Sequence, residues 1–139
     1  MANTETQLII NNETDDFDHR DVPLSLAFSA TEQSLGRSLS IELNFLPLDA
    51  MFHLNNQLRQ KPTATDVISL PHETHTGEVY ICPAFIFQDH HSTDRILHLF
   101  VHGLLHISGY THDHDEDFKA MSLKEIDILN QAGVPNPYA

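Results

Sequence analysis

Apolar residues follow two different spacings along the chain, which together predict short strands and amphipathic helices. Alternation of apolar and polar residues is clearest at Leu39, Ile41, Leu43 and Phe45, and is typical of a half-buried strand. Runs rich in β-formers predict strands at residues 6–12, 36–46, 65–71 and 77–83. The last two runs each end in proline and are joined by the polar stretch HETHT, so we interpret them as neighbouring strands with a loop between them.

Helical spacing of apolar residues accounts for most of the remaining chain. Helices are expected at residues 21–35, 48–60, 84–90, 92–108 and 115–133. Asp21 is the expected N-cap of the first helix, with Pro23 in its first turn. Pro62 ends the second, and Gly109 ends the fourth. We expect the fourth helix to pack against the sheet through its apolar stripe of Ile96, Leu99, Phe100 and Leu104.

This order of elements predicts the fold class. We expect one α+β domain over residues 1–139, with a small mixed sheet of about four strands and about five helices packed with it. A chain of 139 residues can bury a hydrophobic core without disulfides. Its lone cysteine, Cys82, cannot form an internal bridge and fits a reducing compartment.

Charge and the N-terminal sequence limit the kinds of function. The formal net charge is -13, from 20 acidic and 7 basic residues, which argues against broad, non-specific binding to nucleic acid. An RNA-binding site would therefore have to be local. The opening MANTETQLII lacks the features of a signal peptide, and no stretch approaches the ~20 apolar residues of a membrane span. We expect a cytoplasmic protein without a membrane partner.

Histidines are concentrated in HGLLHISGYTH, residues 102–112. His102 and His106 are four apart on a predicted helix and therefore share one face, and Gly109 allows the chain to turn so that His112 can return toward them. Three imidazoles with one open position are typical of a catalytic zinc site, because neutral nitrogen ligands suit Zn²⁺. We therefore expect one zinc ion at these three histidines. The alternative is that they are unrelated helix and loop residues.

The other histidines fit this site less well. His98 lies one turn earlier on the same helix, and we expect it to be buried or to support a ligand. His114, between Asp113 and Asp115, is expected in a solvated loop or in a supporting position behind the ligands. The remaining histidines of this region have no metal-binding spacing and are interpreted as polar loop residues: His72, His75, His90 and His91.

The spacing H-x-x-x-H-x-x-G-x-x-H is also that of metzincin metalloproteases, apart from one position. In that pattern a glutamate follows the first histidine and acts as general base, whereas this chain has Gly103. A metallopeptidase is therefore an alternative that lacks its usual base.

Three segments resemble the YbeY endoribonucleases, bacterial maturation factors of ribosomal RNA. HGLLHISGYTH resembles their signature H-G-x-L-H-x-x-G-Y-D-H, and LNNQLRQKPTATDVISLP, residues 54–71, resembles their stretch L-N-x-x-x-R…P-T-D-V-L-S-F-P. GEVYICP resembles the G-D-I-x-I-S strand that follows, so the likeness covers about residues 40–130. Thr111 replaces the usual aspartate before the third histidine, and Leu70 stands where phenylalanine is common.

The resemblance implies a single α+β domain, a zinc ion held by His102, His106 and His112, and an active-site arginine at Arg59. It implies a zinc-dependent, single-strand-specific endoribonuclease of 16S ribosomal RNA 3′-end maturation and ribosome quality control. The small ribosomal subunit and its proteins would be partners, and DNA would not. A non-catalytic ribosome assembly factor with a zinc site is a further alternative, which the acidity favours.

Arg59 also has a chemical interpretation of its own. A guanidinium can hold a phosphate through two parallel hydrogen bonds and stabilise charge that develops on it. In RQK, Arg59 and Lys61 bring two cations close together, although a solvated helix end also favours cations. We expect Arg59 to line the same cleft as the zinc, although 43 residues separate it from His102. Asp66 is expected to make a structural hydrogen bond at a strand start or turn.

Overall fold

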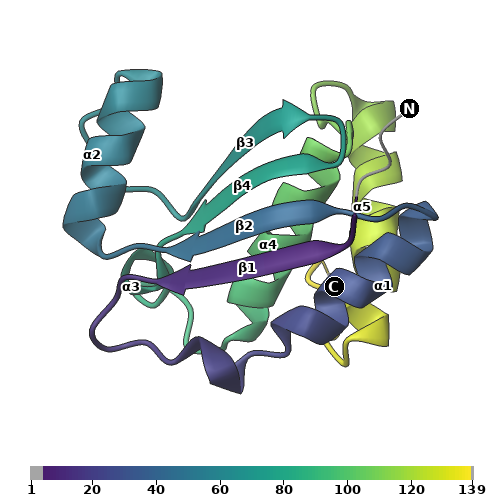
Figure 1. Cartoon of the computed structure of the whole chain (residues 1–139), viewed down its shortest axis with the longest axis horizontal. Coiled ribbons are helices and arrows are strands. Elements are labelled where there is room, and N and C mark those ends of the chain that lie inside the picture. Colours follow the sequence, from purple (N-terminus) through teal and green to yellow (C-terminus); the bar gives the residue numbers. More distant parts are fainter. Residues whose placement is uncertain (1–4, 139) are drawn as a thin grey trace.

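The computed structural model describes residues 5–138. Residues 1–4, which begin the N-terminal stretch that we expect to lack a signal peptide, and residue 139 lie outside this range. Four strands form one mixed sheet in the order β1-β2-β4-β3. They are β1 (Gln7–Asn12), β2 (Ser40–Phe45), β3 (Val67–Glu73) and β4 (Thr76–Ile81). β2 is parallel to both β1 and β4, whereas β3 is antiparallel to β4 (Figure 1).

Five α-helices accompany this sheet in the described part of the chain. They are α1 (Leu24–Leu35), α2 (Leu48–Arg59), α3 (Pro83–Ile86), α4 (Asp94–Ile107) and α5 (Asp115–Gln131), and a 3-10 helix, η1 (His19–Asp21), precedes α1. The predicted α+β class, with a four-stranded mixed sheet and five helices, is confirmed.

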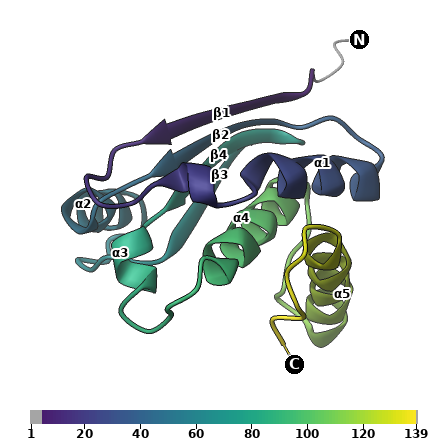
Figure 2. The same ribbon diagram turned by 90° about the horizontal axis from the view of Figure 1, so that it is seen from below.

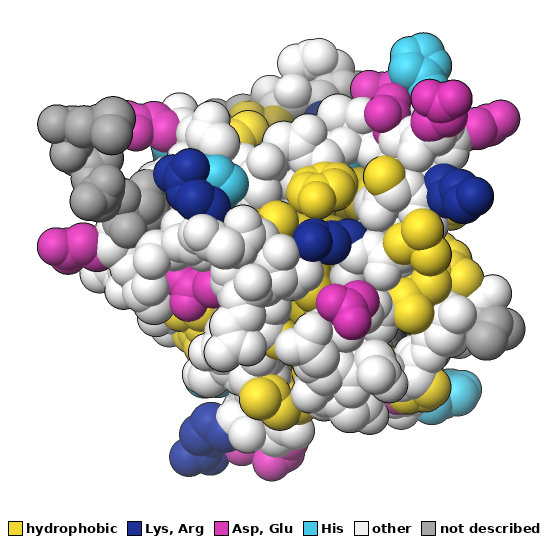
Figure 3. Space-filling view, turned by 90° about the vertical axis from the view of Figure 1, so that its right-hand side faces the viewer, with side chains coloured by type: hydrophobic (Ala, Val, Ile, Leu, Met, Phe, Trp, Pro, Cys, Tyr) yellow, Lys and Arg dark blue, Asp and Glu magenta, His cyan; other side chains and the backbone are white. Residues whose placement is uncertain are grey.

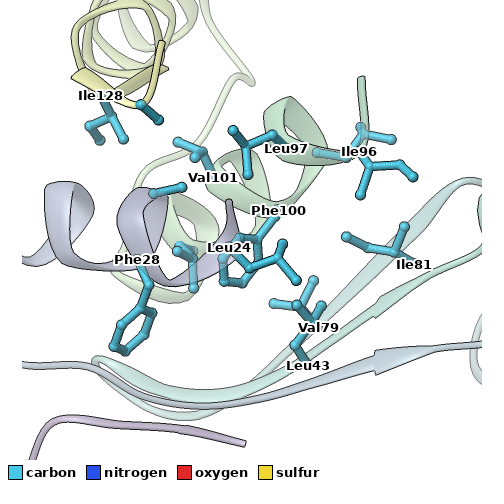
Figure 4. Close-up of a cluster of buried hydrophobic side chains, with 14 of the residues drawn as sticks. Leu24, Phe28, Leu43, Val79, Ile81, Ile96, Leu97, Phe100, Val101 and Ile128 are labelled. Carbon is cyan, nitrogen blue, oxygen red and sulfur yellow. The ribbon is translucent and has the colours of Figure 1, made fainter. Parts of the chain in front are cut away.

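The helices α1 and α4 cover one face of the sheet, and α5 packs on the far side of both (Figure 2). Their apolar side chains meet in one core, in which Phe28 of α1, Leu43 of β2, Val79 of β4, Phe100 of α4 and Ile128 of α5 are all buried (Figure 4). All four residues of the expected apolar stripe on α4 are buried, so its predicted packing against the sheet is confirmed.

A second, smaller core attaches α2 to the other side of the sheet. Met51 of α2 and Ile68 of β3 are buried in it, and Leu70 and Tyr80 pack against it. Along each strand these side chains alternate with the ones that face α4, so they point away from that helix. Leu70 therefore contributes an apolar contact at the position where the YbeY pattern has phenylalanine.

Two expected element ends are wrong. Asp21 does not cap α1: it belongs to η1, and Pro23 directly precedes α1. Asp18 caps η1 instead, with its side chain accepting a hydrogen bond from the Arg20 backbone N–H. α3 also ends at Ile86, so it is shorter than the helix expected over 84–90. Local cap preferences identified the region of the α1 start but not the extra turn in front of it.

The hairpin between β3 and β4 is tighter than expected. β3 continues through Pro71 to Glu73, because an edge strand tolerates the missing proline N–H. Its pairing with β4 is irregular between Pro71 and Glu73. His75 lies in the short turn with a φ of 70° and is buried, with its Nδ1 3.4 Å from Ser108 Oγ. His72 lies on β3 and pairs with Glu78 at 2.9 Å. His72 is therefore a strand residue and not a loop residue, whereas His75 lies in the connecting turn, as expected, but is buried.

The surface reflects the acidic composition unevenly. On the face shown in Figure 3, a group of acidic side chains lies at one edge beside a histidine, and apolar side chains are exposed in several separate patches between the edges. Within residues 5–138, none of the helices combines the length and apolar character needed to cross a membrane.

Candidate active site

The C-terminal end of α4 reverses the chain so that three histidines approach one another. Gly109 has a φ of 103°, a conformation that favours glycine, and the Tyr110 backbone N–H donates to the Leu105 carbonyl at 3.0 Å. The segment after this turn returns His112 toward α4. The predicted role of Gly109 as the stop of this helix is therefore confirmed.

His102, His106 and His112 converge on one point. One ring nitrogen from each lies within 4.8 Å of the others, so the group could hold a metal ion. The Nε2 atoms of His102 and His106 are 3.0 Å apart. The ring centroid of His112 is 5.5 Å from that of His102 and 4.9 Å from that of His106.

The hydrogen bonds of the other ring nitrogens fit a metal ligand set. His102 Nδ1 lies 2.6 Å from Glu125 Oε1, and His106 Nδ1 lies 2.9 Å from the Tyr110 carbonyl oxygen. Because both oxygens only accept, each Nδ1 donates, and the two Nε2 atoms are left with lone pairs when the rings are neutral. Two lone pairs 3.0 Å apart repel unless a cation lies between them. The donor set therefore fits a shared metal ion.

Burial supports the neutral form of His106. It lowers the pKa of that imidazole below its usual value, with a smaller contribution from the neighbouring His102, and these effects outweigh the hydrogen bond to Tyr110. Metal ions bind the neutral imidazole, so this environment favours the state that a ligand needs.

Glu125 of α5 is a buried carboxylate in contact with this group, and the sequence analysis missed it. Its side chain is fully buried and accepts hydrogen bonds from His102, His98 and Tyr138. Burial alone would raise its pKa, but these three donors outweigh burial and lower the pKa to about 2. Glu125 therefore carries a negative charge directly behind His102.

His98 supports this carboxylate and lies outside the three-histidine group. It is buried, and its Nε2 lies 3.1 Å from Glu125 Oε2. Its Nδ1 accepts from Arg95 at 3.0 Å. The expectation that His98 is buried behind the ligands is thus confirmed. His114 directly precedes α5 and also lies outside the group.

Asp66 has the structural role expected of it. Its Oδ1 accepts from the Val67 backbone N–H at 2.7 Å at the start of β3. Its Oδ2 lies 3.6 Å from Arg95 Nη2, so Asp66 also fixes the arginine that contacts His98. Asp66 does not line the cleft that opens over the three histidines.

A cleft of about 560 Å³ opens over the three histidines, between the end of α2, strand β3 and the segment after α4. Arg59, the last residue of α2, lines it, whereas Lys61 does not. Within residues 5–138, no carboxylate pairs with the Arg59 guanidinium. The lining residues are Arg59, Val67, Ser69, Pro71, His102, His106, Gly109, Tyr110, Thr111 and His112. None of these described lining residues is acidic.

Packing in the α2 region explains how Arg59 reaches the cleft. Gln60 ends α2 with a φ of 55°, and its backbone N–H donates to the Asn56 carbonyl. The buried Asn55 donates from Nδ2 to the Thr63 carbonyl at 2.9 Å, which ties the following loop back to the helix. Arg59 is therefore exposed at a fixed helix end beside β3.

Gly103 faces the sheet and not the cleft. A Cβ placed there would lie 2.9 Å from Ser69 Oγ and 3.1 Å from Val79 Cγ1. A side chain as large as glutamate does not fit between α4 and the sheet at this position. The position that holds the general base in metzincins is therefore closed, and the described residues that line the cleft include no carboxylate of the kind that such a peptidase uses.

Three imidazoles converge in this cleft, and the Arg59 guanidinium lines it without a carboxylate partner among the described residues. On this α+β domain, the combination has the composition of a metal-binding site for an anionic substrate. The comparisons with known proteins agree with this class. Residues 5–133 match the protein family described as Endoribonuclease YbeY. The chain belongs to the YbeY endoribonuclease family, as its sequence motifs predicted.

Individual relatives and one solved structure extend this result. The chain is 40% identical over 97 residues to the endoribonuclease YbeY of Alteromonas mediterranea, with 61% of each chain covered. It is 32% identical over 114 residues to the endoribonuclease YbeY of Francisella tularensis subsp. tularensis, with 70% of each covered. The solution structure of TM1509 from Thermotoga maritima has a similar fold, with a TM-score of 0.55 and 18% identity over 91% of this chain and 92% of that one. The chain thus spans about three fifths of the Alteromonas relative's length.

Proposed function

We propose that this chain is a zinc-dependent endoribonuclease that cleaves RNA phosphodiester bonds in the three-histidine cleft. The observation that carries the proposal is the charge of that cleft. Although the chain has a net charge of -13, the described lining residues include an unpaired arginine and no carboxylate. A cleft of this composition favours a phosphate group over the surrounding acidic surface.

Zinc fits the ligand set, because three imidazole ligands with one open position are typical of catalytic zinc sites. When bound, zinc supplies a Lewis acid for a phosphoryl oxygen and lowers the pKa of water. Arg59 would hold the same phosphate through its guanidinium fork and stabilise negative charge on its oxygens. The hydroxyls of Ser69 and Thr111, which line the wall of the cleft, would donate hydrogen bonds to the phosphate or ribose.

The nucleophile has to lose its proton without a carboxylate base in the described cleft lining. Attack by the neighbouring 2′-hydroxyl would break the P–O5′ bond and give a 2′,3′-cyclic phosphate and a 5′-hydroxyl. Attack by water would give a linear phosphate at one of the new ends. The chemical nature of the product ends therefore distinguishes the two routes.

The same proposal includes the biological target. The resemblance to ribosomal RNA maturation factors supports the 3′ end of single-stranded 16S RNA as substrate, with the small ribosomal subunit as partner and the cytoplasm as location. The net charge disfavours strong binding to free RNA, so subunit proteins would help to recruit the enzyme. The same acidity favours a second candidate function, a non-catalytic assembly factor that binds the subunit through protein contacts.

An RNA-cleavage assay tests the proposal with the purified chain, His102→Ala and Arg59→Ala. Lys61→Ala is the matched control, because it removes a nearby cation that does not line the cleft. We expect cleavage by the parent and by the control, and loss of cleavage in the other two variants. Equal trace cleavage by all four proteins would indicate a contaminant and favour the assembly factor.

A further inference from the structure

Glu125 receives three hydrogen bonds at two distinct oxygens. Oε1 faces His102 Nδ1 at 2.6 Å, and Oε2 receives both His98 Nε2, at 3.1 Å, and the Tyr138 hydroxyl. The carboxylate is fully buried, although Tyr138 itself is 44% exposed. A buried carboxylate needs such donors, since an unpaired charge in the interior is costly. Oε1 is thus bonded to His102, whereas Oε2 is bonded to His98 and Tyr138.

The partners of each ring nitrogen indicate where the protons of this cluster lie. A guanidinium only donates, so Arg95 Nη1 donates to His98 Nδ1 at 3.0 Å, and the proton of neutral His98 must lie on Nε2. That Nε2–H then donates to Glu125. His102 donates to the same carboxylate from Nδ1, which leaves His102 Nε2 with its lone pair, at 3.0 Å from His106 Nε2.

We propose that Tyr138 and Glu125 are positioning residues that hold the proton of His102 on Nδ1, so that Nε2 is free to bind metal. This inference rests on the proposed metal site at His102, His106 and His112. Tyr138, 13 residues after Glu125, reaches back from the segment that follows α5 and occupies Oε2 from the outside. Without its hydroxyl, Oε2 keeps only His98 as a donor, and the carboxylate is less firmly oriented toward His102.

Substitution of Glu125 by glutamine gives a specific expectation. An amide has one accepting oxygen and one donating NH₂ group. Two donors meet at the Oε2 position, so the amide oxygen satisfies both only if it lies there. The NH₂ group then faces His102 Nδ1, which must accept. The proton of His102 therefore moves to Nε2, the atom that faces the other two histidines.

The test measures zinc affinity, by competition with a chromophoric chelator, and the proton position on His102, by ¹⁵N NMR of the zinc-free protein. The variants are Tyr138→Phe, Glu125→Gln and His102→Ala. Tyr80→Phe is the matched control, because the Tyr80 hydroxyl also donates to a glutamate, Glu78, at 2.8 Å, on the sheet face turned away from α4.

We expect Glu125→Gln to weaken zinc binding about 10- to 100-fold, as loss of an outer partner of a ligand typically does, and to move the His102 proton to Nε2. Tyr138→Phe should weaken binding by a smaller factor, about 3-fold or more on the same scale. Tyr80→Phe should bind as the parent does. Tyr138→Phe keeps the ring, so it tests the inference even if Glu125→Gln does not fold.

Two other results would distinguish failure of the positioning role from failure of the metal site itself. Parental zinc affinity in Tyr138→Phe and Glu125→Gln, with the His102 proton on Nδ1 and binding lost in His102→Ala, overturns the positioning role but leaves the proposed function intact. Parental affinity in His102→Ala shows that the metal site itself is wrong, and the proposed function fails together with this inference.

Discussion

Gly103 and Ser69 meet where α4 crosses the sheet: a Cβ at position 103 would lie 2.9 Å from the Ser69 hydroxyl oxygen. The same Cβ would lie 3.1 and 3.2 Å from the two methyl carbons of Val79, a buried and stiff β-branched side chain. The helix that carries two of the three converging histidines is therefore held close to β3 and β4 by the absence of a side chain. This contact explains why the position after His102 carries no general base.

We predict that Gly103→Ala destabilises the protein by about 1–3 kcal/mol, the usual effect of overpacking a core. In an unconstrained helix interior the same change stabilises by up to about 1 kcal/mol, so a loss of stability would indicate overpacking at position 103. Urea unfolding measures it. In a Val79→Ala background the cost should shrink, and a stabilised Gly103→Ala single variant would contradict the packing described here.

Arg59→Lys should be a poor replacement for Arg59 in RNA cleavage. Lysine keeps the charge but loses the planar fork that binds two phosphate oxygens. We expect cleavage to fall at least about 10-fold, equivalent to about 1.4 kcal/mol of transition-state stabilisation, while zinc content is unchanged. Parallel measurement of kcat/KM and of bound zinc checks this, and an Arg59→Lys enzyme as active as the parent would show that Arg59 acts only as a point charge.

Zinc should raise the thermal stability of the parent, because a ligand that binds only the folded state stabilises it by mass action. At a free zinc concentration of 100 times Kd the gain is about 2.7 kcal/mol. His112→Ala should abolish the increase in Tm on zinc addition. His114→Ala, which removes a neighbouring histidine outside the three-histidine group, should preserve it. An equal increase in both variants would exclude His112 as a ligand.

His75 should make stability depend on pH. Its burial, followed by the charge of Arg37, lowers the pKa of the imidazole below 6.5. Both states are neutral well above pH 6.5, so the full stability is present there. As the pH falls below 6.5 the unfolded chain takes up the proton first, and the free energy of unfolding decreases until the lower native pKa is reached.

The variant His75→Asn isolates this contribution. Asparagine tolerates the φ of 70° at this position better than most residues do. Urea unfolding at pH 7.5 and 5.5 should show a smaller loss of stability in the variant than in the parent. Identical losses in the two proteins would show that His75 is protonated equally in the folded and unfolded states.

Local patterns predicted most of the fold because each strand and long helix buries one regular face. They failed where non-local pairing decides the structure. The proline rule predicts a strand end at Pro71, yet Pro71 lies within β3, where only an edge strand could accept it. Asp21 has the chemistry of a cap, but it is the last residue of the extra turn η1, and Pro23 directly precedes α1.

For the candidate site, too, the sequence predicted the residues that are close together in the chain but not the distant one. The spacing of His102 and His106 indicated a shared helix face, and the three-histidine group converges as expected. Glu125 was missed because it comes from another helix, 23 residues after His102. One signal was available: Met121, Glu125 and Ile128 form the buried stripe of α5, and a carboxylate within such a stripe needs a partner.

The order in which the chain is synthesised gives the position of Glu125 a further consequence. Residues 102–112 leave the ribosome before α5 and Tyr138 do. A growing chain therefore presents three imidazoles before it has the carboxylate that fixes the proton of His102. The finished arrangement forms only after α5 docks against α4 and α1. The centre is thus completed only after its own histidines have been synthesised, by a segment that supplies none of the three converging imidazoles.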